Sequence, residues 1–375
     1  MQGPSFATAD DGFSPRHPRA QPRLFDALPG LAAEVPWRPL AHLPTPVEPL
    51  SGRFAFLGPG QVAIKRDDLI SPRYGGNKVR RYEFVLADIL ARSKRHIVTA
   101  GGLASTQVTA TASFAEALGL GLTAVLFDQP VTRFAREAVL ADVSLGAELV
   151  YGGSYLNTAL ETARALRRVG PQGALILPGA ATPRANLGYL DAVFELEAQV
   201  RAGHCARPDV VLLPTGSSGT LAALSLGFAF LGWPTEVVGV TIASPWVCNR
   251  LTVGRVVRET ARWIAARDKR FHPSLAHAAR WRLDGVALGR GYGHPSPEAV
   301  AGIARVQQIT GAPGEVTYSG KALAGLSALL RDPRYQQQNI LWWNTLSTPR
   351  PALAPDAEAR VPRALRWVLA APLVA

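Results

Sequence analysis

Residues 96–127 read HIVTAGGLASTQVTATASFAEALGLGLTAVLF, and this run predicts a strand, a turn, a helix and a second strand in succession. The expected strands cover 96–99 and 122–127, the expected helix covers 105–118, and the glycine pair 101–102 forms the turn. Strands that alternate with helices of this length are typical of parallel sheets with right-handed crossovers.

The same alternation continues on both sides of this run. Further strands are expected at 61–65, 148–151, 174–177, 209–213, 236–242 and 340–343, and further helices at 78–93, 133–145, 156–168 and 186–202. The sequence therefore predicts an α/β fold with mostly parallel sheets flanked by helices.

Length and composition exclude several classes of protein. The chain has 375 residues, 47% of them apolar and 18% charged, so it is neither disordered nor a coiled coil and has room for about two domains. No apolar run reaches the ~18 residues that span a bilayer, and no apolar signal-peptide core follows the N-terminus. Cys205 and Cys248 form neither a disulfide framework nor a metal cluster. We expect a cytoplasmic protein with no metal and no membrane contact.

The formal net charge of +12 comes mostly from arginine. Residues 250–290 hold ten basic and three acidic side chains, a density that would suit nucleic acid or another polyanion. No zinc-finger spacing or RNA-binding signature accompanies this segment, so a solvated arginine-rich surface is the favoured interpretation and no nucleic-acid partner is expected. Lysine is scarce, and a primary amine can come only from Lys65, Lys78, Lys94, Lys269 and Lys321.

The segment from Gly216 to Thr220 reads GSSGT and lies between an apolar strand and a helix. Small residues allow close approach of the backbone to a ligand, and a helix N-terminus offers N–H groups and a favourable dipole to an anion. The segment lacks the spacing of a nucleotide P-loop or of the dinucleotide fingerprint. It is either a phosphate site or an ordinary helix start capped by hydroxyl groups.

Lys78 follows Gly75, Gly76 and Asn77 at the start of an amphipathic helix. The helix dipole and burial would both disfavour its ammonium form, which would leave an amine able to attack a carbonyl and form a Schiff base. The alternative is a solvent-facing lysine.

Gly101 and Gly102 precede Ser105 and Thr106, again between a strand and a helix. These hydroxyl groups either cap the helix or help to bind a substrate carboxylate. A phosphate site, a Schiff-base lysine and an anion-binding helix N-terminus together describe a site for pyridoxal 5'-phosphate.

The motifs also resemble a known family, the D-cysteine desulfhydrase and 1-aminocyclopropane-1-carboxylate deaminase family of fold type II pyridoxal phosphate enzymes. The resemblance covers roughly residues 37–351. The segments that carry it are Leu43-Pro-Thr-Pro46, Ile64-Lys-Arg-Asp-Asp68, Gly75-Gly-Asn-Lys-Val-Arg-Arg81, Gly101-Gly-Leu-Ala-Ser105, Gly216-Ser-Ser-Gly-Thr220, Gly291-Tyr-Gly293, Tyr318-Ser-Gly-Lys321 and Asn344-Thr345.

The resemblance implies two α/β domains, each with a twisted, mostly parallel open sheet, and a cofactor in the cleft between them. We expect a loosely ordered extension at 1–35, a large cofactor-binding domain formed by 36–80 and 191–375, and a small domain at 81–190. A homodimer is also implied.

The resemblance implies roles for individual residues. Lys78 would form the Schiff base, Tyr318 would stack on the cofactor ring, Thr345 would lie near the ring nitrogen, and Lys321 would be structural. The implied cofactor-binding residues are Lys78, Asn77, Thr106, Gly216, Ser217, Ser218, Gly219, Thr220, Tyr318 and Thr345. The implied catalytic residues are Lys78, Ser105, Tyr292 and Tyr318, and substrate would contact Ser105, Thr106 and Gln107.

The chain departs from the family pattern at several positions. Thr106 replaces a common Asn, Gln107 is closer to the deaminase branch, and Ser319 is closer to the desulfhydrase-like branch. The terminal turn reads TLS at 345–347 in place of Thr-Gly-Gly, and the loop at 178–183 lacks the usual Gly-Gly-Ser.

The first hypothesis is therefore β-elimination from a small amino acid such as D-cysteine, which gives pyruvate and ammonia. Ring opening of 1-aminocyclopropane-1-carboxylate is the second, and Ser319 argues against it. A catalytically silent protein that binds pyridoxal phosphate is the third, and a polyanion-binding module is the fourth.

Overall fold

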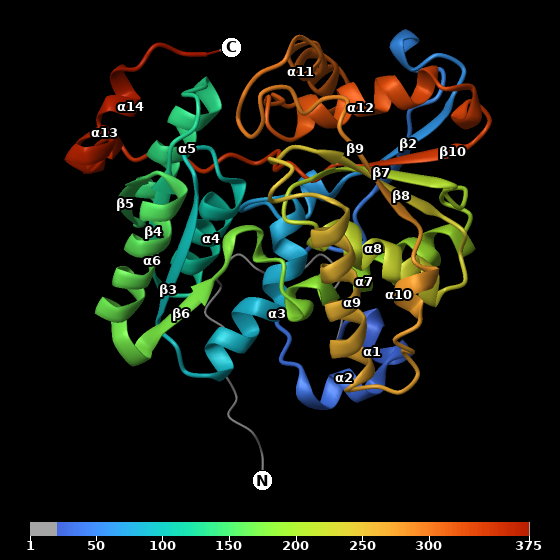
Figure 1. Cartoon of the computed structure of the whole chain (residues 1–375), viewed down its shortest axis with the longest axis horizontal. Helices are drawn as coiled ribbons and strands as arrows, with labels where there is room; N and C mark the ends of the chain where they lie inside the picture. Colours follow the sequence, from blue (N-terminus) through green and yellow to red (C-terminus); the bar gives the residue numbers. More distant parts are fainter. Residues whose placement is uncertain (1–20, 375) are drawn as a thin grey trace.

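The computed structural model describes residues 21–374 and contains two β-sheets with helices on their faces (Figure 1). The four-stranded sheet has strands β3 (His96–Gly102), β4 (Gly121–Phe127), β5 (Glu148–Gly153) and β6 (Gly173–Ile176), and its helices are α4 (Thr106–Ala117), α5 (Arg133–Ser144) and α6 (Tyr155–Val169). The strand order is β5-β4-β3-β6 and every neighbouring pair is parallel. The strand, turn, helix and strand predicted for residues 96–127 are thus confirmed in this sheet.

The six-stranded sheet has strands β1 (Val47–Pro49), β2 (Gln61–Lys65), β7 (Val210–Thr215), β8 (Glu236–Thr241), β9 (Trp281–Asp284) and β10 (Asn339–Trp343). Their order is β1-β2-β10-β7-β8-β9, and only β1 runs antiparallel, to β2. Its helices are α7 (Pro183–Arg201), α8 (Gly219–Phe230), α9 (Arg250–Ala265), α10 (Leu275–Ala278), α11 (Pro297–Thr310) and α12 (Ser319–Arg331). The predicted fold class, two mostly parallel sheets flanked by helices, is confirmed.

Both faces of the six-stranded sheet are buried at its inner strands β7, β8 and β10, which explains why these strands are continuously apolar. Successive residues of a strand point to opposite faces. Accordingly Val211 packs in the core shared with α7, α8 and α9, and Leu212 packs in the core shared with α11 and α12. Trp342 packs in the core shared with α11 and α12, Trp343 packs in the core shared with α7, α8 and α9, and both are fully buried.

Helix α3 (Asn77–Ala91) lies between the two sheets (Figure 1). Its Tyr82 packs in the core of the four-stranded sheet, and its Phe84 packs in the core of the six-stranded sheet. The helix therefore links the two halves of the molecule, and its first turn points to the region where they meet.

The expectation of a loosely ordered N-terminal extension is wrong for residues 21–35, the part that the structure describes. Helices α1 (Arg23–Ala27) and α2 (Pro29–Glu34) are ordered and bury Leu24 and Leu31 in the core of the six-stranded sheet. The prolines were interpreted as breakers, but Pro29 is the first residue of α2, a position that suits proline. The rest of the expected extension, residues 1–20, lies outside the described residues.

The expected domain boundaries also need correction at the C-terminus. Helix α13 (Ala357–Arg360) and the following helix α14 (Trp367–Ala370) pack against the four-stranded sheet, where Ala357 and Val368 are buried (Figure 1). Helix α7 packs against the other sheet from Leu187 onwards. We propose that the small domain consists of about residues 92–180 together with the C-terminal segment.

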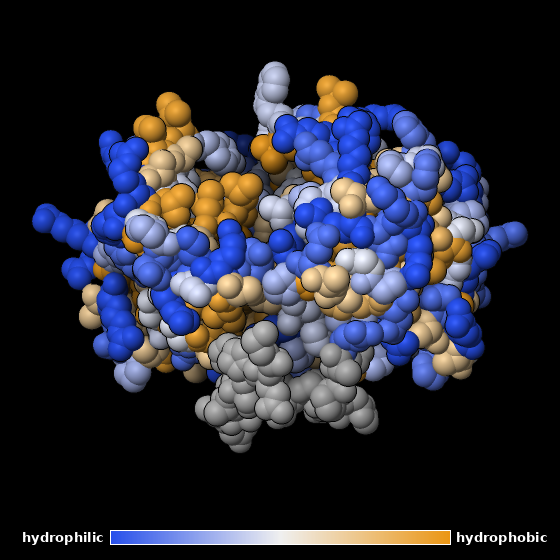
Figure 2. All heavy atoms as spheres, turned by 90° about the horizontal axis from the view of Figure 1, so that it is seen from below, coloured by the Kyte–Doolittle hydropathy of each residue, from blue (hydrophilic) through white to orange (hydrophobic). Residues whose placement is uncertain are grey.

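No helix within residues 21–374 combines the length and the apolar character needed to cross a membrane. Figure 2 shows hydrophilic side chains over most of the face seen from below, with apolar side chains gathered mainly on the side of the four-stranded sheet.

Candidate active site

A cavity of about 600 Å³ opens between the two sheets, where β3, β4, β7 and β8 end. This is the edge at which open α/β sheets bind ligands. Ten residues predicted from the sequence line it: Asn77, Lys78, Ser105, Gln107, Gly216, Ser217, Ser218, Thr220, Tyr292 and Tyr318. Three others, Thr106, Gly219 and Thr345, lie outside its wall.

Lys78 is in the first turn of α3, and the residue is 7% exposed. Its Nζ donates to Oδ1 of Asn77 at 2.8 Å. Burial, and to a smaller extent the charge of Arg81, lower the pKa of Lys78 to about 7. All five lysines belong to the described residues, and Lys78 alone lines the cavity. The cavity therefore contains an amine that is largely unprotonated just above neutral pH.

The segment 216–220 leads from β7 into the start of α8 at the cavity wall. Its N-cap residue, Ser218, has a left-handed backbone with φ of 67°, and no side chain caps the helix. The nearby helices α4 and α6 are capped by serine side chains. A Cβ at Gly219 would lie 2.5 Å from Oδ1 of Asn186, so glycine is required there. The uncapped turn suits an anion such as phosphate.

Arg81 lies behind this turn and is 1% exposed. Its guanidinium donates to the carbonyl oxygen of Ala180 at 2.7 Å and to Oγ1 of Thr220 at 2.8 Å. Burial lowers the pKa of Arg81 to about 10, and no carboxylate among the described residues forms an ion pair with it. A buried cation without a counter-ion is costly, which points to an anion bound at this turn.

Arg81 is not among the site residues predicted from the sequence, although it is part of the quoted GGNKVRR motif. The signal was its spacing: residues 78 and 81 are three apart and share one side of a helix. Most basic residues of this chain are arginines, so the presence of one more arginine at position 81 did not indicate a site.

The N-terminus of α4 forms the opposite wall. Ser105 caps this helix through a long bond, with 3.4 Å between the amide of Val108 and Oγ. A Cβ at Gly101 would lie 2.5 Å from Oγ of Ser105, so the predicted glycine pair is needed for close packing. Nε2 of Gln107 donates to Oγ1 of Thr99 at 2.9 Å, while its Oε1 is buried without a partner among the described residues.

Tyr292 and Tyr318 form a hydrogen-bonded pair in the cavity wall. Their hydroxyl oxygens are 2.7 Å apart, and their rings meet edge to face at 6.0 Å. Burial raises the pKa of Tyr318 to about 12, although hydrogen bonds from Tyr292 and Thr106 act in the opposite direction. Both phenols are therefore protonated at neutral pH, and Thr106 contacts the pair rather than the cavity.

Two buried charged residues hold this pair in place. The carboxylate of Glu315 accepts from the backbone amides of Thr317, Tyr318 and Ser319 at the start of α12. Nζ of Lys321 donates to the carbonyl oxygen of Gly291 at 2.7 Å, and so fixes the loop that carries Tyr292. The structural role implied for Lys321 by the resemblance agrees with this contact.

The altered terminal turn is integrated in the structure. The carbonyl oxygen of Thr345 accepts from the amide of Asn77 at 3.2 Å, and Oγ of Ser347 accepts from the amide of Gly75 at 2.7 Å. The serine that replaces a glycine of the family pattern thus ties this turn to the start of α3. The predicted contact of Thr345 with a cofactor ring remains a prediction.

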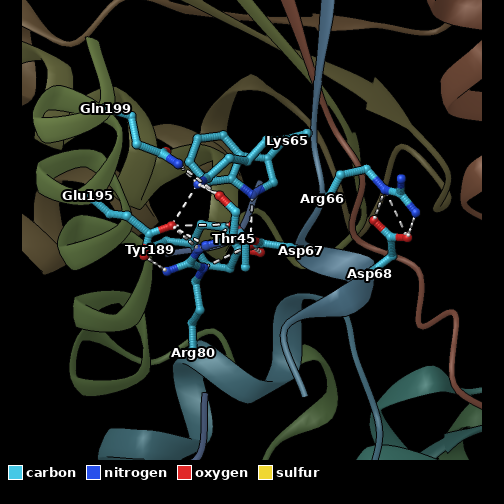
Figure 3. Close-up of polar contacts among 10 residues, drawn as sticks. Thr45, Lys65, Arg66, Asp67, Asp68, Arg80, Tyr189, Glu195 and Gln199 are labelled. Carbon is cyan, nitrogen blue, oxygen red and sulfur yellow. Dashed lines mark hydrogen bonds and ion pairs between the residues drawn. The ribbon is translucent and has the colours of Figure 1, made fainter. Parts of the chain in front are cut away.

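A buried ionic cluster includes Arg80, which lies on α3 two residues after Lys78 (Figure 3). The carboxylate of Glu195 on α7 accepts from Nζ of Lys65 at 2.6 Å and from Nη2 of Arg80 at 3.0 Å. Oδ1 of Asp67 accepts from the same Nη2 of Arg80 at 2.7 Å. The side chains of Lys65, Asp67, Arg80 and Glu195 are at most 2% exposed, and their formal charges cancel.

Further donors complete this cluster. Oδ2 of Asp67 accepts from the hydroxyl of Tyr189 at 2.8 Å and from Nε1 of Trp343 at 2.7 Å. The cluster joins β2, α3, α7 and β10 by way of groups that are fully paired, as buried charges require. Because Arg80 follows Lys78 by two residues, the cluster fixes the helix turn that carries the amine.

The residues present fit pyridoxal phosphate. The uncapped turn of α8 and the unpaired charge of Arg81 suit the phosphate group, and Lys78 lies in the same cavity with a lowered pKa that suits attack on an aldehyde. The paired tyrosines add an aromatic wall beside them. Within residues 21–374 no three His, Cys, Asp or Glu side chains gather as a metal site would require.

Comparison with known proteins gives the same result. The family described as "Pyridoxal-phosphate dependent enzyme" matches residues 39–345. A D-cysteine desulfhydrase of Serratia proteamaculans is 31% identical over 332 residues, which cover 84% of this chain and 95% of the relative. The D-cysteine desulfhydrase of Yersinia pestis strain Pestoides F is 32% identical over 290 residues, which cover 75% of this chain and 84% of the relative.

Solved structures agree. The crystal structure of an ACC deaminase homologue has a TM-score of 0.72 and 27% identity, and covers 89% of this chain and 97% of its own. Isoform 2 of threonine deaminase from Solanum lycopersicum has the same fold, with a TM-score of 0.59 at 17% identity over 93% of this chain and 94% of its own. The family match over residues 39–345 and these relatives therefore show that this chain belongs to the family of pyridoxal-phosphate dependent enzymes.

Proposed function

We propose that this enzyme removes the β-substituent and the amino group of a small amino acid, with D-cysteine as the reference substrate. D-cysteine and water would give pyruvate, ammonia and hydrogen sulfide. The observation that carries the proposal is the amine of Lys78, buried beside an uncapped helix turn in one cavity. Two relatives named D-cysteine desulfhydrase support the choice of reaction.

The cofactor supplies an electron sink that makes loss of a proton from the α carbon feasible. The protein residues bind and orient the substrate and move protons. The N-terminus of α4 suits the substrate carboxylate, because within the described chain Oγ of Ser105 accepts only from the amide of Val108, through a long bond of 3.4 Å. Lys78 has the pKa of an effective base near neutral pH, and the protonated phenols of Tyr292 and Tyr318 are donors.

Ring opening of 1-aminocyclopropane-1-carboxylate is the second candidate. It is supported by Gln107, the residue closer to the deaminase branch, whose Oε1 has no partner among the described residues and which lines the cavity. The solved ACC deaminase homologue also supports it. Ser319 argues against this second candidate. Its hydroxyl is buried and accepts from the amide of Glu315 at 3.0 Å.

The test is to incubate the holoenzyme with D-cysteine, L-cysteine, D-serine and 1-aminocyclopropane-1-carboxylate and to measure keto acid and ammonia. Pyruvate and sulfide from D-cysteine are expected. 2-Oxobutanoate from the cyclic substrate would favour the second candidate. A yellow holoenzyme that releases no keto acid from any of them would contradict both and would identify a silent cofactor-binding protein.

The lowered pKa of Lys78 predicts the pH dependence of cofactor attachment. Below pH 7 the amine is mostly in its ammonium form, which cannot attack an aldehyde, so the attachment rate should rise as the pH passes about 7 and level off above it. A lysine in water would keep gaining reactivity up to its usual pKa of about 10.4. Stopped-flow absorbance of apoenzyme mixed with pyridoxal phosphate measures this, with N-acetyl-lysine amide as control. A rate that climbs steadily to pH 10 would contradict the burial argument.

Replacing Arg81 with methionine should weaken the binding of pyridoxal phosphate about 10- to 100-fold, the usual range for losing a charged hydrogen-bonding group. The pH midpoint of attachment should also rise, because the charge of Arg81 helps to lower the pKa of Lys78. Pyridoxal, which lacks the phosphate, should bind about equally to both proteins. The control is Arg92→Met at the solvent-exposed end of the same helix. Equal losses for both ligands would show general damage to the fold.

The implied homodimer and cytoplasmic location also belong to this proposal. The dimer is supported by the family resemblance, and light scattering of the holoenzyme should give twice the mass of one chain.

A further inference from the structure

The cavity extends beyond the residues assigned to the cofactor, along one stripe of α6. Tyr155, Ala159, Ala163 and Leu166 recur at helical spacing and all line the cavity. The end of β6 adds Leu175 and Leu177 to the same wall. We call these six residues the α6 wall.

An unbroken series of aromatic contacts leads from the tyrosine pair to the α6 wall. Tyr292 contacts Tyr318 at 6.0 Å between ring centroids and Phe127 at 6.1 Å. Phe127 in turn contacts Tyr155 at 4.7 Å. The α6 wall is therefore continuous with the catalytic part of the cavity rather than a separate surface feature.

The six residues of the α6 wall are apolar apart from the hydroxyl of Tyr155, and the wall is open; Thr158 and Thr162 of the same helix also line the cavity. The exposed fractions are 67% for Tyr155, 43% for Leu175 and 52% for Leu177, and Val247 lines the same cavity from the segment after β8 with 53%. Apolar side chains are gathered on this side of the molecule in Figure 2. Exposed apolar surface beside a cleft is typical of a ligand-binding groove. Between Tyr155 and Leu166 on α6, Ala159 and Ala163 present only methyl groups to the cavity.

The cavity carries almost no charge. Among the described residues that line it, Lys78 is the only charged side chain. A charged substituent on the substrate would lose its hydration here without finding a partner, whereas an apolar substituent would gain by leaving water.

We propose that the α6 wall binds the apolar sulfur substituent of S-alkyl or S-aryl D-cysteines, and that these thioethers, rather than free D-cysteine, are the preferred substrates. This inference rests on the proposed β-elimination. The α carbon loses its proton, the bond between Cβ and sulfur breaks, and the sulfur leaves as a thiol after it gains a proton. One water molecule then converts the remaining three-carbon unit into pyruvate and ammonia.

The competing explanation is that the α6 wall packs against Val247 when the two domains close. In that case filling the space between them would reduce turnover of every substrate to the same extent. Selective loss of the bulky substrates is expected only if the substituent itself occupies the wall.

The first measurement compares kcat/KM of the holoenzyme for D-cysteine, S-propyl-D-cysteine, S-benzyl-D-cysteine and S-carboxymethyl-D-cysteine by pyruvate release. The benzyl and propyl compounds should exceed D-cysteine by about 10-fold or more, since one methylene in an apolar pocket can change this ratio about 10- to 200-fold. The carboxymethyl compound, similar in length to propyl but charged, should fall below S-propyl-D-cysteine by about 10-fold.

The second measurement uses variants. Ala163→Phe, and independently Ala159→Leu, should lower the benzyl-to-cysteine ratio of kcat/KM by about 10-fold. Leu160→Phe, on the same helix but outside the cavity wall, should leave this ratio unchanged. The cofactor absorbance confirms that each variant forms holoenzyme.

The outcomes separate the two proposals. If D-cysteine is turned over but outcompetes the thioethers, or if the ratio is unchanged in both alanine variants, the assignment of the α6 wall is wrong and the β-elimination stands. If none of the four compounds yields pyruvate while the holoenzyme forms normally, the proposed function itself is wrong.

Discussion

Replacing Lys78 with alanine is expected to lower turnover by about 10³-fold or more while the cofactor still binds. Positioned proton transfer alone contributes about 10²–10⁴-fold, and Lys78 is the only lysine in the cavity wall of the described chain. The turn at the start of α8 and Arg81, which we propose to bind the phosphate, do not depend on this side chain, so pyridoxal phosphate should remain bound without a covalent link.

Borohydride reduction followed by peptide mapping measures the covalent link directly. In the unaltered protein the cofactor should be fixed on the peptide that contains Lys78, and in Lys78→Ala on none. Lys94→Ala is the control, because Lys94 is not part of the cavity wall and donates to the carbonyl oxygen of Pro171. Label on another lysine, or near-normal turnover by the alanine variant, would contradict the assignment.

Replacing Glu195 with glutamine should produce the largest loss of stability. The substitution keeps the shape but removes one of two negative charges that balance Lys65 and Arg80 in a fully buried cluster (Figure 3). Leaving a buried charge without its partner costs about 3–5 kcal/mol. The midpoint of chemical denaturation at pH 7 measures the loss. Glu197→Gln, two residues further along α7 in a partly exposed ion pair with Arg201, should cost less than about 1 kcal/mol.

The same cluster predicts how stability changes in acid. Burial alone would raise the pKa of Glu195, but the charges of Arg80 and Lys65 lower it well below its usual range. A carboxyl with a lowered folded pKa contributes stability that is complete above the unfolded value of about 4.3 and is lost as the pH falls further. The difference in the free energy of unfolding between the unaltered protein and Glu195→Gln should therefore shrink from about pH 5 towards pH 3. A constant difference over this range would show that charge pairing is not the cause.

Local signals in the sequence were sufficient for much of the fold. The strand, glycine pair and helix at 96–118 are visible because hydrophobic period, turn residues and helix cap all lie within a few consecutive positions. Strand β9 at 281–284 was missed, because its four residues are only partly buried and show no strand-like apolar pattern. Helices α1 and α2 were missed because prolines near their starts resemble breakers.

The candidate site also has parts that local sequence signals indicated and parts that depend on contacts between distant residues. The GSSGT turn and the lysine after a glycine pair are compact motifs, and the sequence alone indicated an anion site and an amine of lowered pKa. The contact of Arg81 with Thr220 joins residues 139 positions apart, and that of Lys65 with Glu195 joins residues 130 positions apart. No local pattern encodes such pairs.

The sequence by itself determined the alternating elements and identified Lys78 and the turn at 216–220 as candidates, since each depends on neighbouring residues and on backbone geometry. Only the tertiary structure decided that two sheets bring these parts to one cavity, that Arg81 has no carboxylate partner within residues 21–374, and that α6 provides an apolar wall. The reason is physical: burial, and with it the pKa of Lys78 and the polarity of the cavity, is set by which distant segments pack together.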